Sequence, residues 1–326
     1  MAELQLVWGW QPALYLFLGG MGAGAYIMAG ILYFYDRKNN ERLISAATWA
    51  ATVSLIVGLL LLLSELTNPL RGMLLWQSFS NGSSWMTFGA WAVFAAVIVF
   101  GLMALLSTKK VVLAATKKWK KFSKTQARIR NVLAVLGIVL GFVVAAYTGI
   151  LLVSAPGIPL WNTFLLPVLF TVSALDTGVA LVEIFAISLE KKQKGVHHTD
   201  KAHKLLQRCV AVLVVIEVVV LFVFLSTMLS GSSDNAVIAA TGIASANTLL
   251  SGTLAPFFWV LVVTCGLVLP FLAAIFGLAK RSKNSENFAL VGAAGALLGG
   301  CALRFLILMA GLHANVVVSA VASLVW

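Results

Sequence analysis

Four ionisable side chains stand inside long apolar stretches of this chain. Asp176 and Glu183 share one stretch, Glu217 lies in the next, and Arg304 lies in the last. On a helix, the spacing of seven residues puts Asp176 and Glu183 on one face, about 10 Å apart along the axis. Such groups are costly in an apolar setting and are therefore candidate functional residues. They could pass protons through intervening water, or they could only hold helices together through buried pairs.

Aromatic and polar side chains gather at some ends of these stretches. The first stretch opens with "WGWQPALY", and two connectors read "ELTNPLRGMLLWQ" and "YTGILLVSAPGIPLWN". Trp and Tyr are common at any membrane interface, but that does not explain Gln11, Arg71 and the connectors rich in proline and glycine. An apolar wall with a few hydrogen-bonding groups suits a lipid-soluble headgroup such as a quinone.

A quinone makes specific demands on its site. Its carbonyl oxygens accept hydrogen bonds from donors such as tyrosine hydroxyls, and its oxidation or reduction moves protons to or from titratable groups. The candidate quinone-binding residues are Trp8, Gln11, Tyr15, Glu65, Arg71, Tyr147 and Trp161. The candidate residues for proton transfer are Asp176, Glu183, Glu217, Arg304 and Glu65.

The elements that position these residues follow from composition. Hydrophobic residues make up 61% of the 326 residues, charged residues make up only 10%, and the mean hydropathy is +0.99. The apolar runs are continuous and do not alternate, so we predict an all-α integral membrane protein and not a membrane β-barrel. It would form one membrane domain over residues 1–326, with eight transmembrane helices near 12–35, 44–64, 86–107, 131–153, 163–189, 209–229, 253–279 and 288–311.

The net charge of +12 is distributed on one side of this predicted topology. All of the Lys and Arg residues except Arg71 and Arg304 fall in the alternate loops 36–43, 108–130, 190–208 and 280–287. Basic loops face the cytoplasm, so both termini are expected outside a prokaryotic cytoplasmic membrane. These loops would be solvated or would touch anionic lipid headgroups, and no nucleic-acid partner is expected. The first stretch follows Glu3 and no basic residue, so it is not expected to be a cleavable signal.

Histidines and cysteines give no sign of a metal centre. Three histidines fall in the basic loop 190–208, where we expect them to be solvated: His197, His198 and His203. The fourth, His313, follows the last stretch, so no pair of histidines inside the bundle is available to hold a haem. The three cysteines lie in separate stretches: Cys209, Cys265 and Cys301. We therefore expect no haem, no iron–sulfur cluster and no other metal in this chain.

Several segments, taken in order, resemble one family over nearly the whole chain. They are "WGWQPALYLFLGGMGAGAY", "SELTNPLRGMLLWQSFSNGSSWMTFGAW", "YTGILLVSAPGIPLWNTFLLPVLFTVSALDTGVAL" and the stretch around Arg304. This combination resembles the NrfD/polysulfide reductase membrane-subunit family. The resemblance implies a haem-free anchor that oxidises menaquinol, or reduces a quinone, at its outer side. It also implies two partners on the outer face, a four-cluster [4Fe-4S] ferredoxin-like subunit and a molybdopterin subunit that reduces a sulfur compound, an S-oxide or an oxyanion.

The resemblance carries over to individual residues unevenly. Tyr147 matches the family tyrosine that contacts a quinone carbonyl, and Glu65 matches an acid at the end of the second span. Some members place an Asn and a His early in the first span. Here Tyr15 stands in the place of the His, and Gln11 or Pro12 stands in the place of the Asn.

Two other classes of function remain open from the residues. Acids in the membrane and a lone arginine also suit an ion-coupled secondary transporter, although the two halves of the chain show no matching pair of broken helices. A passive scaffold is the third reading. It predicts that Asp176, Glu217 and Arg304 each tolerate an apolar replacement with full activity.

Overall fold

The computed structural model describes residues 3–4, 8–65, 85–118, 122–155, 157–192, 200–231, 235–279 and 283–314. Arg71, His197 and His198 lie outside these ranges, and Glu65 ends its helix with a side chain outside the description. The helices are α1 (Trp10–Glu65), α3 (Trp85–Ser107), α4 (Lys109–Lys118), α5 (Phe122–Val153), α6 (Leu165–Lys192), α7 (Asp200–Leu229), α8 (Ala236–Leu250), α9 (Ala255–Phe257), the π-helix η2 (Phe258–Val268), α10 (Leu269–Ala279) and α11 (Lys283–Met309). Two short strands complete the described part, β1 (Glu3–Leu4) and β2 (Leu312–His313).

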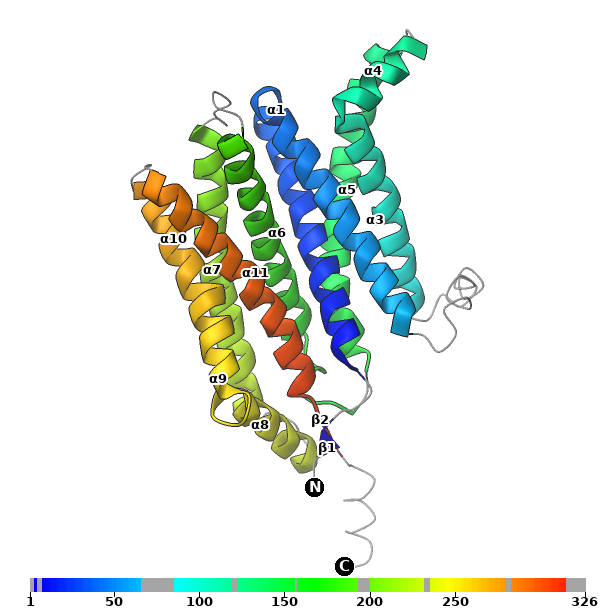
Figure 1. Ribbon diagram of the computed structural model, residues 1–326. Helices are drawn as coiled ribbons and strands as arrows, with labels where there is room; N and C mark the ends of the chain where they lie inside the picture. Colours follow the sequence, from blue (N-terminus) through cyan, green and yellow to red (C-terminus); the bar gives the residue numbers. More distant parts are fainter. Residues whose placement is uncertain are drawn as a thin grey trace, which may run out of the picture.

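Seven helices of the described part are long and apolar enough to cross a membrane, which confirms the all-α membrane class. The first of them, α1, has 56 residues and non-helical backbone at Asp36 and Asn40. Figure 1 shows that α1 turns back on itself there and forms two antiparallel arms. The predicted spans 12–35 and 44–64 correspond to these arms. The count of eight treats each arm as a separate crossing and stays a prediction, as does the outward orientation of both termini.

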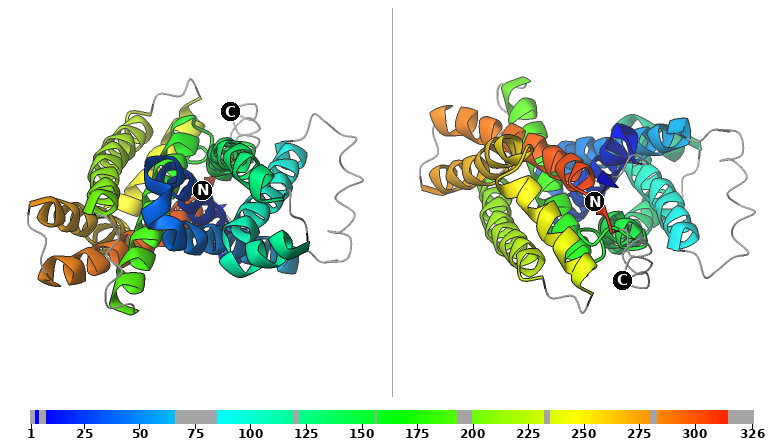
Figure 2. Two further views of the ribbon diagram at one scale, coloured as in Figure 1. Left: turned by 90° about the horizontal axis from the view of Figure 1, so that it is seen from above. Right: turned by 90° about the horizontal axis from the view of Figure 1, so that it is seen from below.

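The first arm of α1 lies in the middle of the bundle. It packs against α5 on one side and α6 on the other. Figures 1 and 2 show α3 and α5 on one flank, and α6, α7, α10 and α11 on the opposite flank. The helix ends next to the basic loops all lie at one end of the bundle, at the top of Figure 1. We call this the basic end; α8 and the strands lie at the opposite end.

The antiparallel pairing of β1 with β2 joins the start of the described chain to the segment after α11. Glu3 is opposite His313 and Leu4 is opposite Leu312. This two-residue ladder therefore closes the bundle at the end opposite the basic loops.

Glycines allow the backbone of α1 to lie in direct contact with the backbone of α6. A β-carbon on Gly24 would overlap the carbonyl oxygen of Ala174, and one on Gly178 would overlap the backbone of Gly24 and Ala25. On another side of the same arm, a β-carbon on Gly22 would lie 2.9 Å from the carbonyl oxygen of Ala51 in the second arm. Small residues at such crossings are the usual means of tight helix packing in membranes.

The segment η2 crosses α11 just as closely. A β-carbon on Gly266 would lie 2.8 Å from the α-carbon of Gly299. The π-helical winding is accompanied by a hydrogen bond from the Thr264 hydroxyl to the carbonyl of Trp259, 2.9 Å long and five residues back. Short π-helical segments often occur beside functional sites.

We expect Gly24→Ala to destabilise the bundle, because the added methyl group would overlap the α6 backbone. Overpacking of this kind costs about 1–3 kcal/mol. Gly19→Ala is the matched control, since its β-carbon would have Thr148 as its nearest neighbour at an ordinary 3.9 Å. Thermal unfolding in detergent should show a lower melting temperature for Gly24→Ala only. Equal melting temperatures for both variants would contradict the proposed backbone contact.

Candidate functional site

Two tyrosines from different helices come together near the end of the bundle opposite the basic loops. Tyr15 is in the second turn of α1 and Tyr147 is near the end of α5; their side chains are 5% and 4% exposed and interact electrostatically. We call them the tyrosine pair. Among the residues that the structure describes, neither phenol hydroxyl has a hydrogen-bond partner. A tyrosine hydroxyl that no neighbouring protein group engages is available to donate to a ligand, so this pair fits a ligand that brings its own acceptor atoms.

Glycines shape the walls around the tyrosine pair. The Tyr147 ring lies where a β-carbon on Gly89 of α3 would be, so only glycine leaves room for it. Tyr15 packs against Gly58 in the second arm of α1, where a β-carbon would lie 3.4 Å from the Tyr15 ring. Glu65 is the last residue of the same arm, seven residues after Gly58 in the sequence. The pair is thus enclosed by three helices, α1, α3 and α5.

The other predicted quinone-binding residues divide into two groups. Gln11 is half-buried and lies one turn before Tyr15 on the same face of α1. Trp8 and Trp161 instead form an edge-to-face contact, with ring centroids 5.8 Å apart. The Trp161 indole is fully buried and donates a 2.9 Å hydrogen bond to the carbonyl of Ile307, so this N–H is not available to a ligand. Trp161 therefore joins the segment before α6 to α11.

Arg304 is fully buried in α11 and is held by α6. Its guanidinium donates to the Ser173 hydroxyl at 2.8 Å, to the Gly300 carbonyl at 2.8 Å and to the Phe170 carbonyl at 3.2 Å. It also lies 5.1 Å from the centre of the Phe170 ring. Gly20 of α1 leaves space for the guanidinium, since a β-carbon there would lie 3.2 Å from Nη2. Neutral oxygens thus supply its direct contacts.

Ser173 connects Arg304 to the acids of neighbouring helices. Its hydroxyl accepts from Arg304, and Ser173 also lines the same pocket as the Glu217 carboxyl of α7. Arg304 and Glu217 attract each other electrostatically, although no carboxylate of the described residues comes within 4.0 Å of the guanidinium. Sequence reasoning missed Ser173; the signal was its position one turn before Asp176 on a helix that carries two acids.

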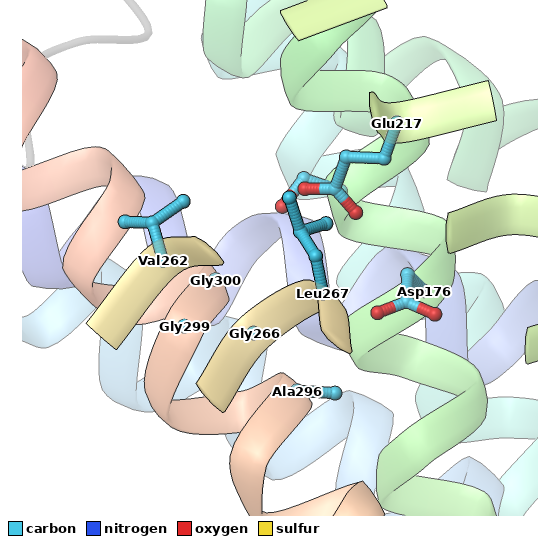
Figure 3. A pocket seen from close by; sticks show the side chains of 9 residues that line it. Asp176, Glu217, Val262, Gly266, Leu267, Ala296, Gly299 and Gly300 are labelled. Atoms are coloured by element: carbon cyan, nitrogen blue, oxygen red, sulfur yellow. The ribbon is translucent and has the colours of Figure 1, made fainter. Parts of the chain in front are cut away.

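Asp176 and Glu217, which the sequence analysis named as candidates for proton transfer, line one small pocket. Figure 3 shows both carboxyls at this pocket beside η2 and α11. The remaining lining residues are Ser173, Val262, Gly266, Leu267, Ala296, Gly299 and Gly300. In the described part of the molecule, one carboxyl oxygen of Asp176 has no hydrogen-bond partner. The close crossing of η2 and α11 therefore borders an acid pocket that adjoins Arg304.

Glu183 lies apart from this pocket, closer to the basic end. Its side chain is 4% exposed, and within the described ranges its Oε1 has no hydrogen-bond partner. Its electrostatic partner is His203. The expectation that His203 is a solvated loop residue was wrong: it is 7% exposed, and its Nε2 lies 3.0 Å from Oε1 of Glu190. The reason is that α7 begins at Asp200, nine residues before the predicted span.

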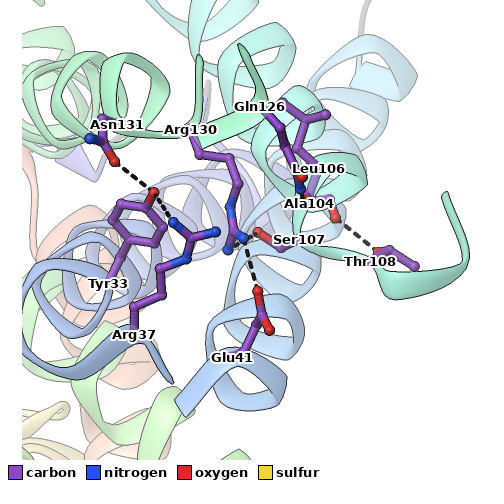
Figure 4. Close-up of polar contacts among 10 residues, drawn as sticks. All are labelled: Tyr33, Arg37, Glu41, Ala104, Leu106, Ser107, Thr108, Gln126, Arg130 and Asn131. Atoms are coloured by element: carbon purple, nitrogen blue, oxygen red, sulfur yellow. Dashed lines mark hydrogen bonds and ion pairs between the residues drawn. The ribbon is translucent and has the colours of Figure 1, made fainter. Parts of the chain in front are cut away.

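The basic loop 108–130 was also predicted as solvated, and its last residue is not. Arg130 is 1% exposed and pairs with Glu41 at 2.9 Å, beside the Ser107 hydroxyl at 3.3 Å (Figure 4). Its guanidinium lies 5.1 Å from the centre of the Tyr33 ring. This cluster holds the turn of α1 against α3 and α5. Its donors and acceptors largely satisfy each other, so its role here is packing at the basic end.

No grouping of three or more His, Cys, Asp or Glu residues within the described ranges is arranged to hold a metal ion. Cys209, Cys265 and Cys301 lie on α7, η2 and α11, and all three are free thiols.

Comparison with known proteins finds relatives that match nearly the whole length of the chain. The family described as "Polysulphide reductase, NrfD" matches residues 2–316. A polysulfide reductase subunit of Wolinella succinogenes is 32% identical over 316 residues, which is 94% of each protein. Protein NrfD of Escherichia coli is 29% identical over 319 residues, which is 94% of this protein and 95% of that relative. A selenate reductase subunit of Mesobacillus selenatarsenatis is 26% identical over 199 residues, 54% of this protein and 46% of that relative.

Both the family match and the similarity to the polysulfide reductase subunit extend over nearly the full length, from the tyrosine pair to Arg304. Two of these relatives are named as subunits of reductases. The seven long apolar helices described above are what a membrane subunit needs. The chain therefore belongs to the polysulphide reductase NrfD family.

Proposed function

We propose that this protein is the quinone-reactive membrane subunit of an oxidoreductase complex, with the quinone headgroup bound at the tyrosine pair. The observation that carries this proposal is the proximity of two largely buried tyrosines whose hydroxyls make no hydrogen bond to another described residue. A quinone offers two carbonyl oxygens that need donors, and its isoprenoid tail belongs in lipid. Menaquinol is the expected substrate, and oxidation is the expected direction.

The residues divide the work of such a reaction between them. The hydroxyls of Tyr147 and Tyr15 donate to the headgroup oxygens and fix the ring. Gln11, one turn from Tyr15, supplies a further hydrogen bond, and Glu65 and Arg71, six residues apart in the sequence, complete the proposed site. Oxidation of one quinol to quinone releases two protons and two electrons. Glu65 accepts protons, and the electrons pass to an iron–sulfur partner.

Partners complete the proposed complex. A four-cluster ferredoxin-like subunit on the outer face takes the electrons and passes them to a molybdopterin subunit. The names of two relatives, one a polysulfide reductase subunit and the other a selenate reductase subunit, support a terminal reductase of this class. The membrane is a prokaryotic cytoplasmic membrane crossed by eight segments, with both termini outside and the basic end in the cytoplasm.

The buried acids form a second part of the proposal. Asp176, Glu217 and Glu183, together with Arg304, carry protons between the basic end and the middle of the bundle. Their burial supports this role, because an acid in an apolar interior holds or releases a proton according to small changes around it. One carboxyl oxygen of Asp176 and one of Glu183 have no hydrogen-bond partner in the described residues, so each is available to accept a proton or a hydrogen bond.

Replacing Tyr147 with Phe removes one hydrogen-bond donor and keeps the ring against Gly89. We expect quinol-dependent turnover of the complex to fall about tenfold, the equivalent of roughly 1.4 kcal/mol for one hydrogen bond. Activity measured with a soluble electron-donor dye should not change. Tyr35→Phe is the control, since Tyr35 is 53% exposed to the surroundings of the bundle. Unchanged quinol turnover in Tyr147→Phe would count against the tyrosine pair as the site.

Asp176→Asn and Glu217→Gln keep the shape of each side chain and remove its exchangeable acid proton. In closed vesicles, we expect each change to abolish proton movement that accompanies quinol turnover, while the melting temperature stays close to that of the wild type. Turnover in detergent, where no gradient can form, should remain. If both variants move protons at the wild-type rate, the acids serve only to pack the helices.

A further inference from the structure

The polar residues of α6 and α7 stand at matching levels along the two helices. Glu190, Glu183 and Asp176 recur every seven residues on α6, and the corresponding α7 positions are His203, Val210 and Glu217. Since the helices are antiparallel, seven steps along one helix match seven steps back along the other. Two contacts fix this register: the Glu190–His203 pair at one end and the pocket shared by Asp176 and Glu217 at the other.

These residues form a continuous line, which we call the α6–α7 seam: Glu190, His203, Glu183, Asp176 and Glu217. Successive levels are about 10 Å apart along the axis. Every member is withdrawn from the surroundings of the bundle, and the side chains of His203 and Glu190 are the most accessible, at 9% and 10%. Asp176 interacts electrostatically with both Glu217 and Glu183, so a change of charge at one level affects the acids at the next.

The Glu190–His203 pair closes the end of the seam at the basic end of the bundle. His203 interacts with three acids from two helices: Glu190 and Glu183 on α6, and Glu286 in the first turn of α11. One turn further along α7, the Gln207 side chain lies where a β-carbon on Gly277 of α10 would be, which seals that side.

A histidine in this position has a property that the acids of the seam lack. Its ring has two separate nitrogens, so one can take up a proton while the other gives one up. One of these nitrogens, Nε2, contacts Glu190. The next acid inward, Glu183, has an oxygen without a hydrogen-bond partner in the described residues. The most accessible pair of the seam, Glu190 and His203, thus lies one level outward from a buried acid, Glu183.

We propose that His203, oriented by Glu190, is the port through which protons enter the α6–α7 seam from the basic end. The proposal rests on the proton-carrying role given above to the buried acids. Protonated His203 passes its proton through an entering water molecule to the Glu183 carboxylate, which becomes a neutral acid, and the water is left unchanged. The neutral ring then takes a proton from water at the basic end, so the port returns to its starting state and no electron is involved.

The test uses the whole complex in closed vesicles, with the His203→Gln variant. Glutamine keeps a hydrogen-bonding group for Glu190 but cannot carry a proton near neutral pH. We expect proton uptake from the basic end to slow on the order of a hundredfold, the size of effect typical for removal of one proton-transfer group. Quinol turnover in detergent and the melting temperature should stay at the wild-type values. In His203→Ala, added imidazole should restore part of the uptake.

Lys204→Gln is the matched control, because Lys204 is the next residue of α7 and is exposed. It removes one charge from the same turn and should leave proton uptake unchanged. A Lys204→Gln effect equal to that of His203→Gln would overturn the port and indicate a general surface-charge effect.

Failure of the port and failure of the quinone site give different results. Wild-type uptake in His203→Gln overturns the port while quinol turnover stands. A large drop in melting temperature in both His203 variants, without rescue by imidazole, also overturns it and leaves a structural pair. If the wild-type complex does not oxidise quinol, the quinone site fails. The port is then tested by measuring proton flux under an imposed membrane potential. This flux must still be slower in His203→Gln than in the wild-type complex.

Discussion

A single buried cation, Arg304, determines how the helices around it must be arranged. A guanidinium without water needs acceptors on every side, because an unsatisfied charge in an apolar interior is strongly destabilising. In this bundle the acceptors for the two terminal nitrogens are the Ser173 hydroxyl and the Phe170 and Gly300 carbonyls, which tie α11 to α6, while Nε has no partner among the described residues. Glu217 on α7 balances the charge through Ser173. The Arg304 side chain therefore fixes how α11, α6 and α7 pack against one another.

The glycines of α1 are a consequence of the same requirement. Gly20 leaves room for the guanidinium, and Gly24 lets the α1 backbone meet Gly178 of α6 one turn further on. Phe17, three residues before Gly20, places its ring 6.0 Å from the guanidinium carbon. The glycine-rich first stretch is thus a surface shaped for α6 and for Arg304, and not only an apolar anchor.

Much of this arrangement could be predicted from sequence, and the failures share a physical cause. Continuous apolar runs predict the long helices, because lipid leaves the backbone no other way to satisfy its hydrogen bonds. The membrane acids and Arg304 stand out for the same reason, since charges are rare there. His203 and Arg130 were misplaced because charged neighbours in the sequence suggested solvent. Helices that extend beyond the apolar core bury their inward face even where the sequence is polar, and hydropathy averages over both faces.

Ser173 and Gly89 illustrate a second reason why part of the site could not be predicted from the sequence. Their roles depend on residues from other helices, Arg304 for Ser173 and Tyr147 for Gly89. No local pattern contains such a pairing, because contacts between distant segments arise only when the bundle is assembled. The pairing of Tyr15 with Tyr147 belongs to this group as well: the sequence proposes both residues, and only the fold brings them together.

The first arm of α1 is the physical link between the two parts of the proposed mechanism. Tyr15 lies on the side of the arm that meets α5, while Phe17 and Gly20 lie on the side that meets Arg304. Tyr15 and Gly20 are separated by only about 8 Å along the axis. The backbones of α1 and α6 are in direct contact. Side-chain movements alone therefore cannot accommodate a small shift of this arm at the tyrosine pair. Any movement of α1 on quinone binding would therefore change the surroundings of Arg304, and through Ser173 those of Glu217. Coupling between quinone chemistry and the acid pocket thus requires no long pathway, since one rigid helix contacts both.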